Sequence, residues 1–214
     1  FATAYAGIKS GDSEDATLIL LEPETVIAGL FTSSMTRSAP VIDCQNKIGI
    51  NVANTGAATI INSGNANAFT GRHGELAVRE IIAELSARVQ IPVERIFSSS
   101  TGVIGELLEY QKIIDVFDHL VDSLHGSKIE NAARAIMTTD TFPKGSSVKV
   151  SSSGGKITIS GIAKGSGMIA PNMGTMLVYI FTDALIDKND LQSIVSDLNE
   201  ETFNCITAVS YTHL

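Results

Sequence analysis

The chain has 214 residues and a formal net charge of −8. This length suffices for one substantial hydrophobic core, and the negative charge argues against nucleic acid or an anionic membrane as a partner, because both attract clustered Lys and Arg. The longest apolar runs are shorter than the roughly 20 residues of a membrane-spanning helix, so we expect no membrane partner and favour a small-molecule ligand.

Short runs rich in β-branched residues predict strands, in chain order, at residues 16–21, 26–31, 58–61, 95–97, 148–150, 157–159 and 176–181. Apolar residues at helical spacing predict amphipathic helices over residues 78–89, 113–124 and 191–198. Gly154-Gly155 predicts a hairpin turn, and Asp187 predicts a helix N-cap. Alternating strands and helices predict a layered α/β fold, and in the absence of a repeat or linker we expect one domain over residues 1–207.

Cys44 and Cys205 lie far apart in the sequence and form no CxxC pair. They share no metal-ligand spacing with the four histidines. We therefore expect no metal site and a reducing compartment.

Four polar segments that contain glycine interrupt the apolar pattern, at residues 62–71 (NSGNANAFTG), 98–106 (SSSTGVIGE), 138–144 (TTDTFPK) and 164–175 (KGSGMIAPNMGT). Each alone is typical of an ordinary turn. As a functional interpretation, Thr101 and Gly102 can present a hydroxyl and a backbone N–H to an oxyanion in a turn after a strand, and Lys164 can hold an anionic substrate group. A lone loop lysine is more commonly solvated, so both interpretations stay open.

The junction Gly174-Thr175 precedes the apolar run at residues 176–181 and has two interpretations. In the first, Thr175 Oγ attacks the Gly174 carbonyl, which no Cβ shields, and hydrolysis of the resulting ester frees the α-amine of Thr175. That amine, with a pKa of roughly 7.7–8.0, can then activate the hydroxyl as a nucleophile. In the second, the pair is an ordinary turn before a strand, and these two residues alone do not decide between the two.

The motifs NSGNANAFTG, STGVIGE, TTDTFPK and AKGSGMIAPNMGTML, in this order, resemble the ornithine acetyltransferases, also called glutamate N-acetyltransferases, of arginine biosynthesis. The resemblance runs from Phe1 to Thr207. It implies a layered α/β fold of the self-processing, N-terminal-nucleophile-like type. It also implies that the chain is cut before Thr175 into an α chain, residues 1–174, and a β chain that begins with residues 175–207. It also implies acetyl transfer from N-acetylornithine to glutamate through an acetyl-Thr175 intermediate, and in bifunctional members from acetyl-CoA as well.

The same resemblance assigns roles to individual residues. Thr175 matches the nucleophile, Thr101 and Gly102 match the oxyanion hole, and Gly174-Thr175 matches the cleavage site. The positions that match the family's substrate-binding residues are Thr138, Lys164 and Thr175. The resemblance further implies that no cofactor is held, that acetyl-CoA enters only as a substrate, and that the α and β chains stay together as a heterotetramer.

Two departures from the family pattern bear on activity. Gly174 stands where the family usually has Ala, which bears on the rate of cleavage. Residues 208–214 (AVSYTHL) leave the pattern altogether. We therefore expect a non-native tail, a sequence truncated at both ends, and no activity from these residues alone.

Two other functions also fit the residues. One is a self-processing aminopeptidase or amidase, in which water accepts the acyl group; acetyl transfer to glutamate, measured against hydrolysis, separates it from a transferase. The other is a non-catalytic binding module for small acidic metabolites, in which Thr175 is an ordinary strand residue. An uncut chain would favour the binding module.

Overall fold

The computed structural model describes residues 1–50, 52–152, 154–169, 176–206 and 208. The chain forms two compact units: unit 1 comprises Phe1–Thr25 and Ser34–Thr138, and unit 2 comprises Val26–Ser33 and Thr139–Leu214. Each unit contains one β-sheet with helices, so the predicted α/β class is confirmed. The single domain expected over residues 1–207 stays a prediction.

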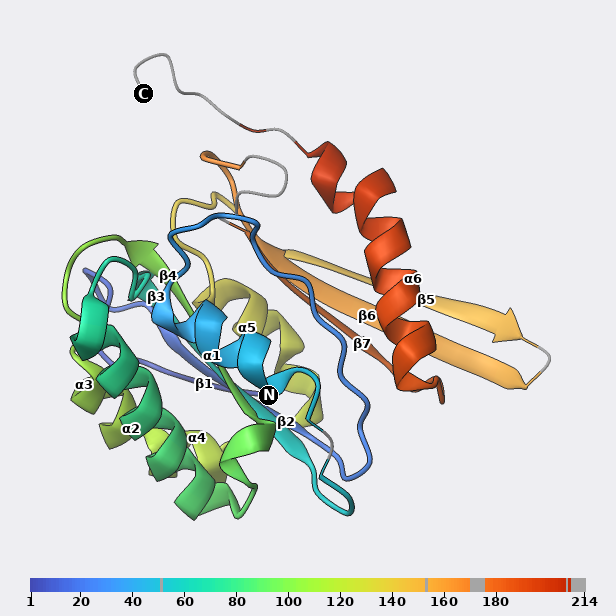
Figure 1. Cartoon of the computed structure of the whole chain (residues 1–214), viewed down its shortest axis with the longest axis horizontal. Helices are drawn as coiled ribbons and strands as arrows, with labels where there is room; N and C mark the ends of the chain where they lie inside the picture. The colour runs from blue at the N-terminus through green and yellow to red at the C-terminus, as the bar shows by residue number, and fades with distance from the viewer. Residues whose placement is uncertain (51, 153, 170–175, 207, 209–214) are drawn as a thin grey trace. The chain divides into compact units, whose positions relative to one another are not determined.

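Unit 1 is built on a four-stranded sheet with the order β1-β2-β3-β4 (Figure 1). The strands are β1 (Ala2–Ala4), β2 (Ala16–Leu21), β3 (Ala57–Asn65) and β4 (Ile96–Val103). The first three pair antiparallel, whereas β3 and β4 run parallel. Parallel neighbours need a long crossover, which helix α2 (Gly71–Val89) supplies. The carboxyl ends of β3 and β4 therefore meet at one end of the sheet.

The other helices of unit 1 are α1 (Ala39–Lys47), α3 (Tyr110–Asp115), α4 (Phe117–Asp122) and α5 (Ile129–Ala135), with 3₁₀ turns η1 (Val93–Arg95) and η2 (Gly126–Lys128). Helix α2 buries one face, because its apolar residues recur at spacings of three and four. The side chains that form the core with it come from β2, β3, β4, α3 and α4, among them Leu18, Ile60, Ile96, Ile113 and Phe117.

Unit 2 is a three-stranded antiparallel sheet with the order β5-β6-β7, followed by one long helix. Its elements are β5 (Lys144–Ser152), β6 (Gly155–Lys164), β7 (Leu177–Thr182), α6 (Lys188–Glu201) and the 3₁₀ turn η3 (Phe203–Cys205). The predicted N-cap is confirmed, since the Asp187 side chain accepts a hydrogen bond from Asn189 N at 2.8 Å. Helix α6 has no buried residue, and Ile180 of β7 is 54% exposed, so this unit leaves much apolar surface uncovered.

Two predicted elements were wrong in detail. Residues 26–31 do not form a strand: the backbone of Gly29 instead pairs with the side-chain amide of Gln192 in α6, at 3.1 Å and 3.3 Å. The helix predicted over residues 113–124 is two helices, α3 and α4, which meet at Val116 with φ −98° and ψ 2°. The apolar residues on which the prediction rested do face the core, since Ile113 and Leu120 are both buried.

Candidate active site

Two of the four polar segments meet at the carboxyl ends of the parallel strands β3 and β4. The register pairs Asn62 with Ser100, Ser63 with Thr101, and Gly64 with Gly102. The predicted turn at Thr101-Gly102 is therefore the last part of a strand, because hydroxyl-bearing residues continue the ladder past the apolar run. The loops beyond stay joined by backbone hydrogen bonds, such as Gly105 N to the Ala68 carbonyl at 2.9 Å.

Gly102 and Gly64 lie in close backbone contact. A Cβ on Gly102 would stand 2.3 Å from the Gly64 carbonyl carbon, and its φ of +137° lies in the region that favours glycine. Thr101, beside it, is 8% exposed. This contact explains why a glycine must follow the threonine and leaves the Gly102 backbone without a shielding side chain.

The asparagines of residues 62–71 are buried and bond to one another's backbone. Asn62 donates to the Asn65 carbonyl at 2.9 Å and accepts from Ser100 Oγ at 2.6 Å. Asn65 Oδ1 accepts from Asn67 N at 2.7 Å, and Asn67 Nδ2 donates to the Gly74 carbonyl at 3.1 Å. These side chains fix the loop after β3, as buried polar groups must be satisfied, so their described contacts are structural.

A buried carboxylate outside the four segments holds the neighbouring loop. Asp15 is 1% exposed and accepts hydrogen bonds from the backbone N–H groups of Ala6, Ile8 and Lys9 at 2.6–2.9 Å. A Cβ on Gly64 would lie 2.9 Å from Lys9 N, so this loop packs directly on the end of β3. Sequence reasoning missed Asp15, because its role depends on a loop folding back onto it.

The segment that leads to Thr138 is tied to the same strand end. The Ala135 carbonyl accepts from Ser63 Oγ at 2.5 Å and from Lys9 Nζ at 2.9 Å. Thr138 follows three residues later, is partly buried, and is the last residue of unit 1. Thr101, Gly102 and Thr138 thus belong to one unit whose loops are cross-linked by buried hydrogen bonds.

The remaining candidate residues belong to unit 2. Lys164 ends β6, is 3% exposed, and lies opposite Leu177 in the register of β6 and β7. Burial lowers the pKa of the Lys164 ammonium, the Asp140 carboxylate opposes this by raising it, and the Lys144 ammonium lowers it further. Asp140 Oδ1 contacts Lys144 Nζ at 2.6 Å. The alternative interpretation of Lys164 as a solvated loop lysine is therefore wrong, because its side chain is buried.

The cleavage site and nucleophile, Gly174 and Thr175, lie outside the described residues. The described part of β7 begins two residues later, at Leu177. Their roles stay predictions.

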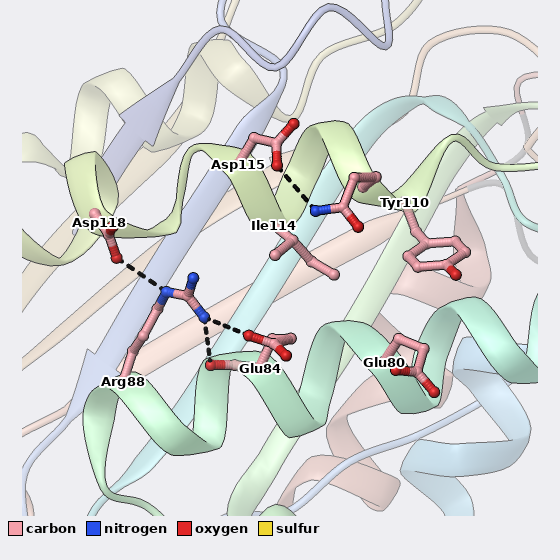
Figure 2. Close-up of a pocket in the computed structure, with 8 residues that line it drawn as sticks. Glu80, Glu84, Arg88, Tyr110, Ile114, Asp115 and Asp118 are labelled. Carbon is pink, nitrogen blue, oxygen red and sulfur yellow. Dashed lines mark hydrogen bonds and ion pairs between the residues drawn. The ribbon is translucent and has the colours of Figure 1, made fainter.

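A separate groove of about 420 Å³ lies between α2 and the helices α3 and α4 (Figure 2). Arg88 Nη1 contacts Glu84 at 2.7 Å, and Arg88 Nε contacts Asp118 at 2.9 Å. Hydrogen bonds to these two carboxylates raise the pKa of Arg88. None of the described candidate residues lines this groove, whose walls are mostly charged side chains of α2, α3 and α4.

Within the described ranges, no group of three His, Cys, Asp or Glu side chains is placed to hold a metal ion. In the same ranges, no helix combines the length and hydropathy needed to cross a membrane.

Comparison with known proteins gave consistent matches. A family model described as the ArgJ family matches residues 1–212. The arginine biosynthesis bifunctional protein ArgJ of Ruegeria pomeroyi is 50% identical over 99% of this chain and 52% of its own length, and that of Bartonella henselae is 44% identical over 99% and 51%. The chain thus spans about half the length of the curated relatives it matches.

Two crystal structures also match, each with a TM-score of 0.71 and 31% identity. One is the arginine biosynthesis bifunctional protein argJ of Bacillus halodurans, with 81% of this chain and 89% of that chain covered. The other is the ornithine acetyltransferase of Mycobacterium tuberculosis complexed with ornithine, with 82% and 91% covered. At this identity and TM-score the likeness extends over most of the fold.

Proposed function

Because the chain belongs to the ArgJ family, we propose that the full-length protein carrying it transfers an acetyl group from N-acetylornithine to glutamate. The observation that carries this proposal is the family match over residues 1–212, which includes all four polar segments. The related structure that was crystallised with ornithine supports an ornithine-derived substrate. Acetyl-CoA is a second donor in this proposal, as the word bifunctional in the relatives' names allows.

Self-cleavage is the first step of the proposal. Thr175 Oγ attacks the Gly174 carbonyl, the acyl group moves from nitrogen to oxygen, and water hydrolyses the ester to leave a new carboxylate and a free Thr175 amine. The lengths of the related chains support this step. The crystallised chains are matched over 89% and 91% of their length, whereas the curated sequences are matched over 52% and 51%. The crystallised chains are therefore shorter than the curated sequences, as cleavage requires.

Acetyl transfer then proceeds by double displacement. The Thr175 amine takes the proton from Oγ, Oγ attacks the acetyl carbonyl of N-acetylornithine, and ornithine leaves as the amine after accepting that proton. The α-amine of glutamate next attacks acetyl-Thr175, which releases N-acetylglutamate and restores the hydroxyl. No external oxidant, reductant or resident cofactor is needed.

Thr101 and Gly102 supply the oxyanion donors in this proposal, through a side-chain hydroxyl and a backbone N–H. One such donor is typically worth about 3–4 kcal/mol in the transition state. The close Gly64–Gly102 contact supports the assignment, since it fixes the backbone at that point. Thr138 and Lys164 bind the substrate, with the buried Lys164 ammonium suited to a carboxylate.

The proposal extends to assembly and location. The α and β chains stay associated after cleavage, as a heterotetramer, and the enzyme works in the cytoplasm. Both statements derive from the family resemblance.

The variant Thr175→Ala tests the proposal in the full-length protein. Wild-type protein should give two pieces by intact mass, with Thr175 as the new N-terminus, and should transfer acetyl from N-acetylornithine to glutamate. The variant should stay in one piece and transfer none, because both steps need the hydroxyl. Hydrolysis without transfer to glutamate, or an uncut wild-type protein that is active, would contradict the proposal.

A further inference from the structure

Asp140 is a buried carboxylate to which sequence analysis gave no role. Its side chain is 1% exposed, and its Oδ1 accepts hydrogen bonds from Lys144 Nζ at 2.6 Å and from Gly165 N at 2.8 Å. Taking a carboxylate out of water is costly unless it is paired and hydrogen-bonded. Gly165 directly follows Lys164, so Asp140 bonds to the turn that leaves the candidate binding lysine.

The contact with Gly165 fixes the backbone at the end of β6. Gly165 has a φ of +149°, which lies in the region that favours glycine. The hydrogen bond to Asp140 holds the chain in this conformation where the ladder with β7 ends, at the pair Lys164 and Leu177. The Asp140 carboxylate therefore helps to fix the backbone conformation directly after Lys164.

Among the described residues of unit 2, Asp140 and Lys144 both act on the Lys164 ammonium, besides its burial. Burial lowers its pKa, Asp140 raises it, and Lys144, at the start of β5, lowers it. The partner of Lys164 across the ladder to β7 is Leu177, which does not titrate. Asp140 and Lys144 thus act on Lys164 with opposite signs.

We propose that Asp140 is the positioning residue for Lys164: it holds the Lys164–Gly165 turn and supplies the negative charge beside the buried ammonium. The ligand of Lys164 rests on the proposed function, as the carboxylate of N-acetylornithine or glutamate. Asp140 itself touches no substrate in this proposal and acts only through Lys164.

The test compares three variants of the full-length protein. Asp140→Asn keeps the shape and removes the charge. Lys144→Gln removes the competing cation, whose side chain is 33% exposed, and should therefore be tolerated by the fold. The matched control is Asp43→Asn, which breaks a similar ion pair four residues apart, between Asp43 and Lys47 at 2.8 Å in unit 1.

The readout is the titration of Lys164 itself. Trace acetylation with acetic anhydride across a pH series, followed by peptide mass spectrometry, gives the pKa of that amine without any need for turnover. Asp140→Asn should move it down by about one unit or more, because an opposite charge close by typically raises it by that much. Lys144→Gln should move it up, and Asp43→Asn should leave it unchanged.

Kinetics give the second readout. In Asp140→Asn the KM for both substrates should begin to rise at a lower pH than in the wild-type protein, because Lys164 loses its charge at a lower pH, while kcat changes little. A merely structural role would instead lower kcat, or raise KM, to the same extent at every pH. Unchanged titration in Asp140→Asn and Lys144→Gln, or shifts of the same sign, would overturn the inference.

Two further outcomes are also decisive. If Asp140→Asn does not fold, Lys144→Gln still tests the electrostatic part of the inference: the titration of Lys164 should move up, and an unmoved titration would contradict that part. If the wild-type protein transfers no acetyl group, the proposed function fails, while the titration of Lys164 still decides the role of Asp140.

Discussion

The substitution Gly102→Ala would test the close contact between β3 and β4. The added Cβ would stand 2.3 Å from the Gly64 carbonyl carbon, 2.5 Å from its oxygen and 2.6 Å from Asn65 N. All three atoms belong to the backbone, so no change of side-chain rotamer can relieve the steric clash. In addition, φ at Gly102 is +137°, which L-residues rarely adopt.

Two terms add to the expected loss of stability. A non-glycine residue in such a backbone conformation costs about 1–3 kcal/mol. Forcing the strands apart costs a further ~1–3 kcal/mol, as overpacked sites do. We therefore expect Gly102→Ala to lower the free energy of unfolding by about 2–6 kcal/mol.

Substitutions at two other glycines separate the cost of backbone strain from the cost of overpacking. Gly105 has a φ of +87° but nothing within 4 Å of an added Cβ, so Gly105→Ala should show the strain alone, about 1–2 kcal/mol. Gly126 has neither strain nor a close neighbour, and Gly126→Ala should be neutral or stabilising by up to about 1 kcal/mol. Equilibrium urea unfolding followed by circular dichroism measures all three. A loss in Gly102→Ala no larger than that in Gly105→Ala would refute the close contact.

Two further predictions concern activity. Thr101→Ala should lower kcat by about 100-fold or more and change KM little, because the donor acts on charge that exists only in the transition state; unchanged kcat in steady-state assays would remove Thr101 from the oxyanion hole. The 214 residues expressed alone should aggregate and transfer no acetyl group, because α6 buries no residue and the chain spans 52% of the R. pomeroyi protein; a soluble product with measurable transfer would contradict this.

Much of the fold was predictable, because a helix or strand with one buried face has apolar residues at regular spacing in the sequence. The apolar spacing over residues 78–89 lies within α2, and the β-branched run at residues 157–159 lies within β6. The short elements β1 and α5 were not predicted. Helix α5 buries Ala132, Ala133 and Ala135, and small apolar residues give a weak periodic signal.

The candidate site was predictable as segments but not as contacts. Thr101 and Gly102 stand out as a hydroxyl followed by a glycine, yet their pairing with Ser63 and Gly64 depends on a parallel register that no local pattern encodes. In the sequence Asp140 is indistinguishable from an ordinary acidic loop residue. Its role depends on the hydrogen bond from Gly165 N, which lies 25 residues further along the chain. The roles of Thr175 and Gly174 remain predictions.

The segment Val26–Ser33 has a consequence for biosynthesis. It belongs to unit 2, although the chain on both sides of it belongs to unit 1. Its contact through Gly29 reaches Gln192, which is 163 residues further along the chain. At a synthesis rate of roughly 5–20 residues per second, about 8–30 s pass on the ribosome before that partner exists. Unit 1 can thus fold during translation, while this early segment has to wait until helix α6 is made.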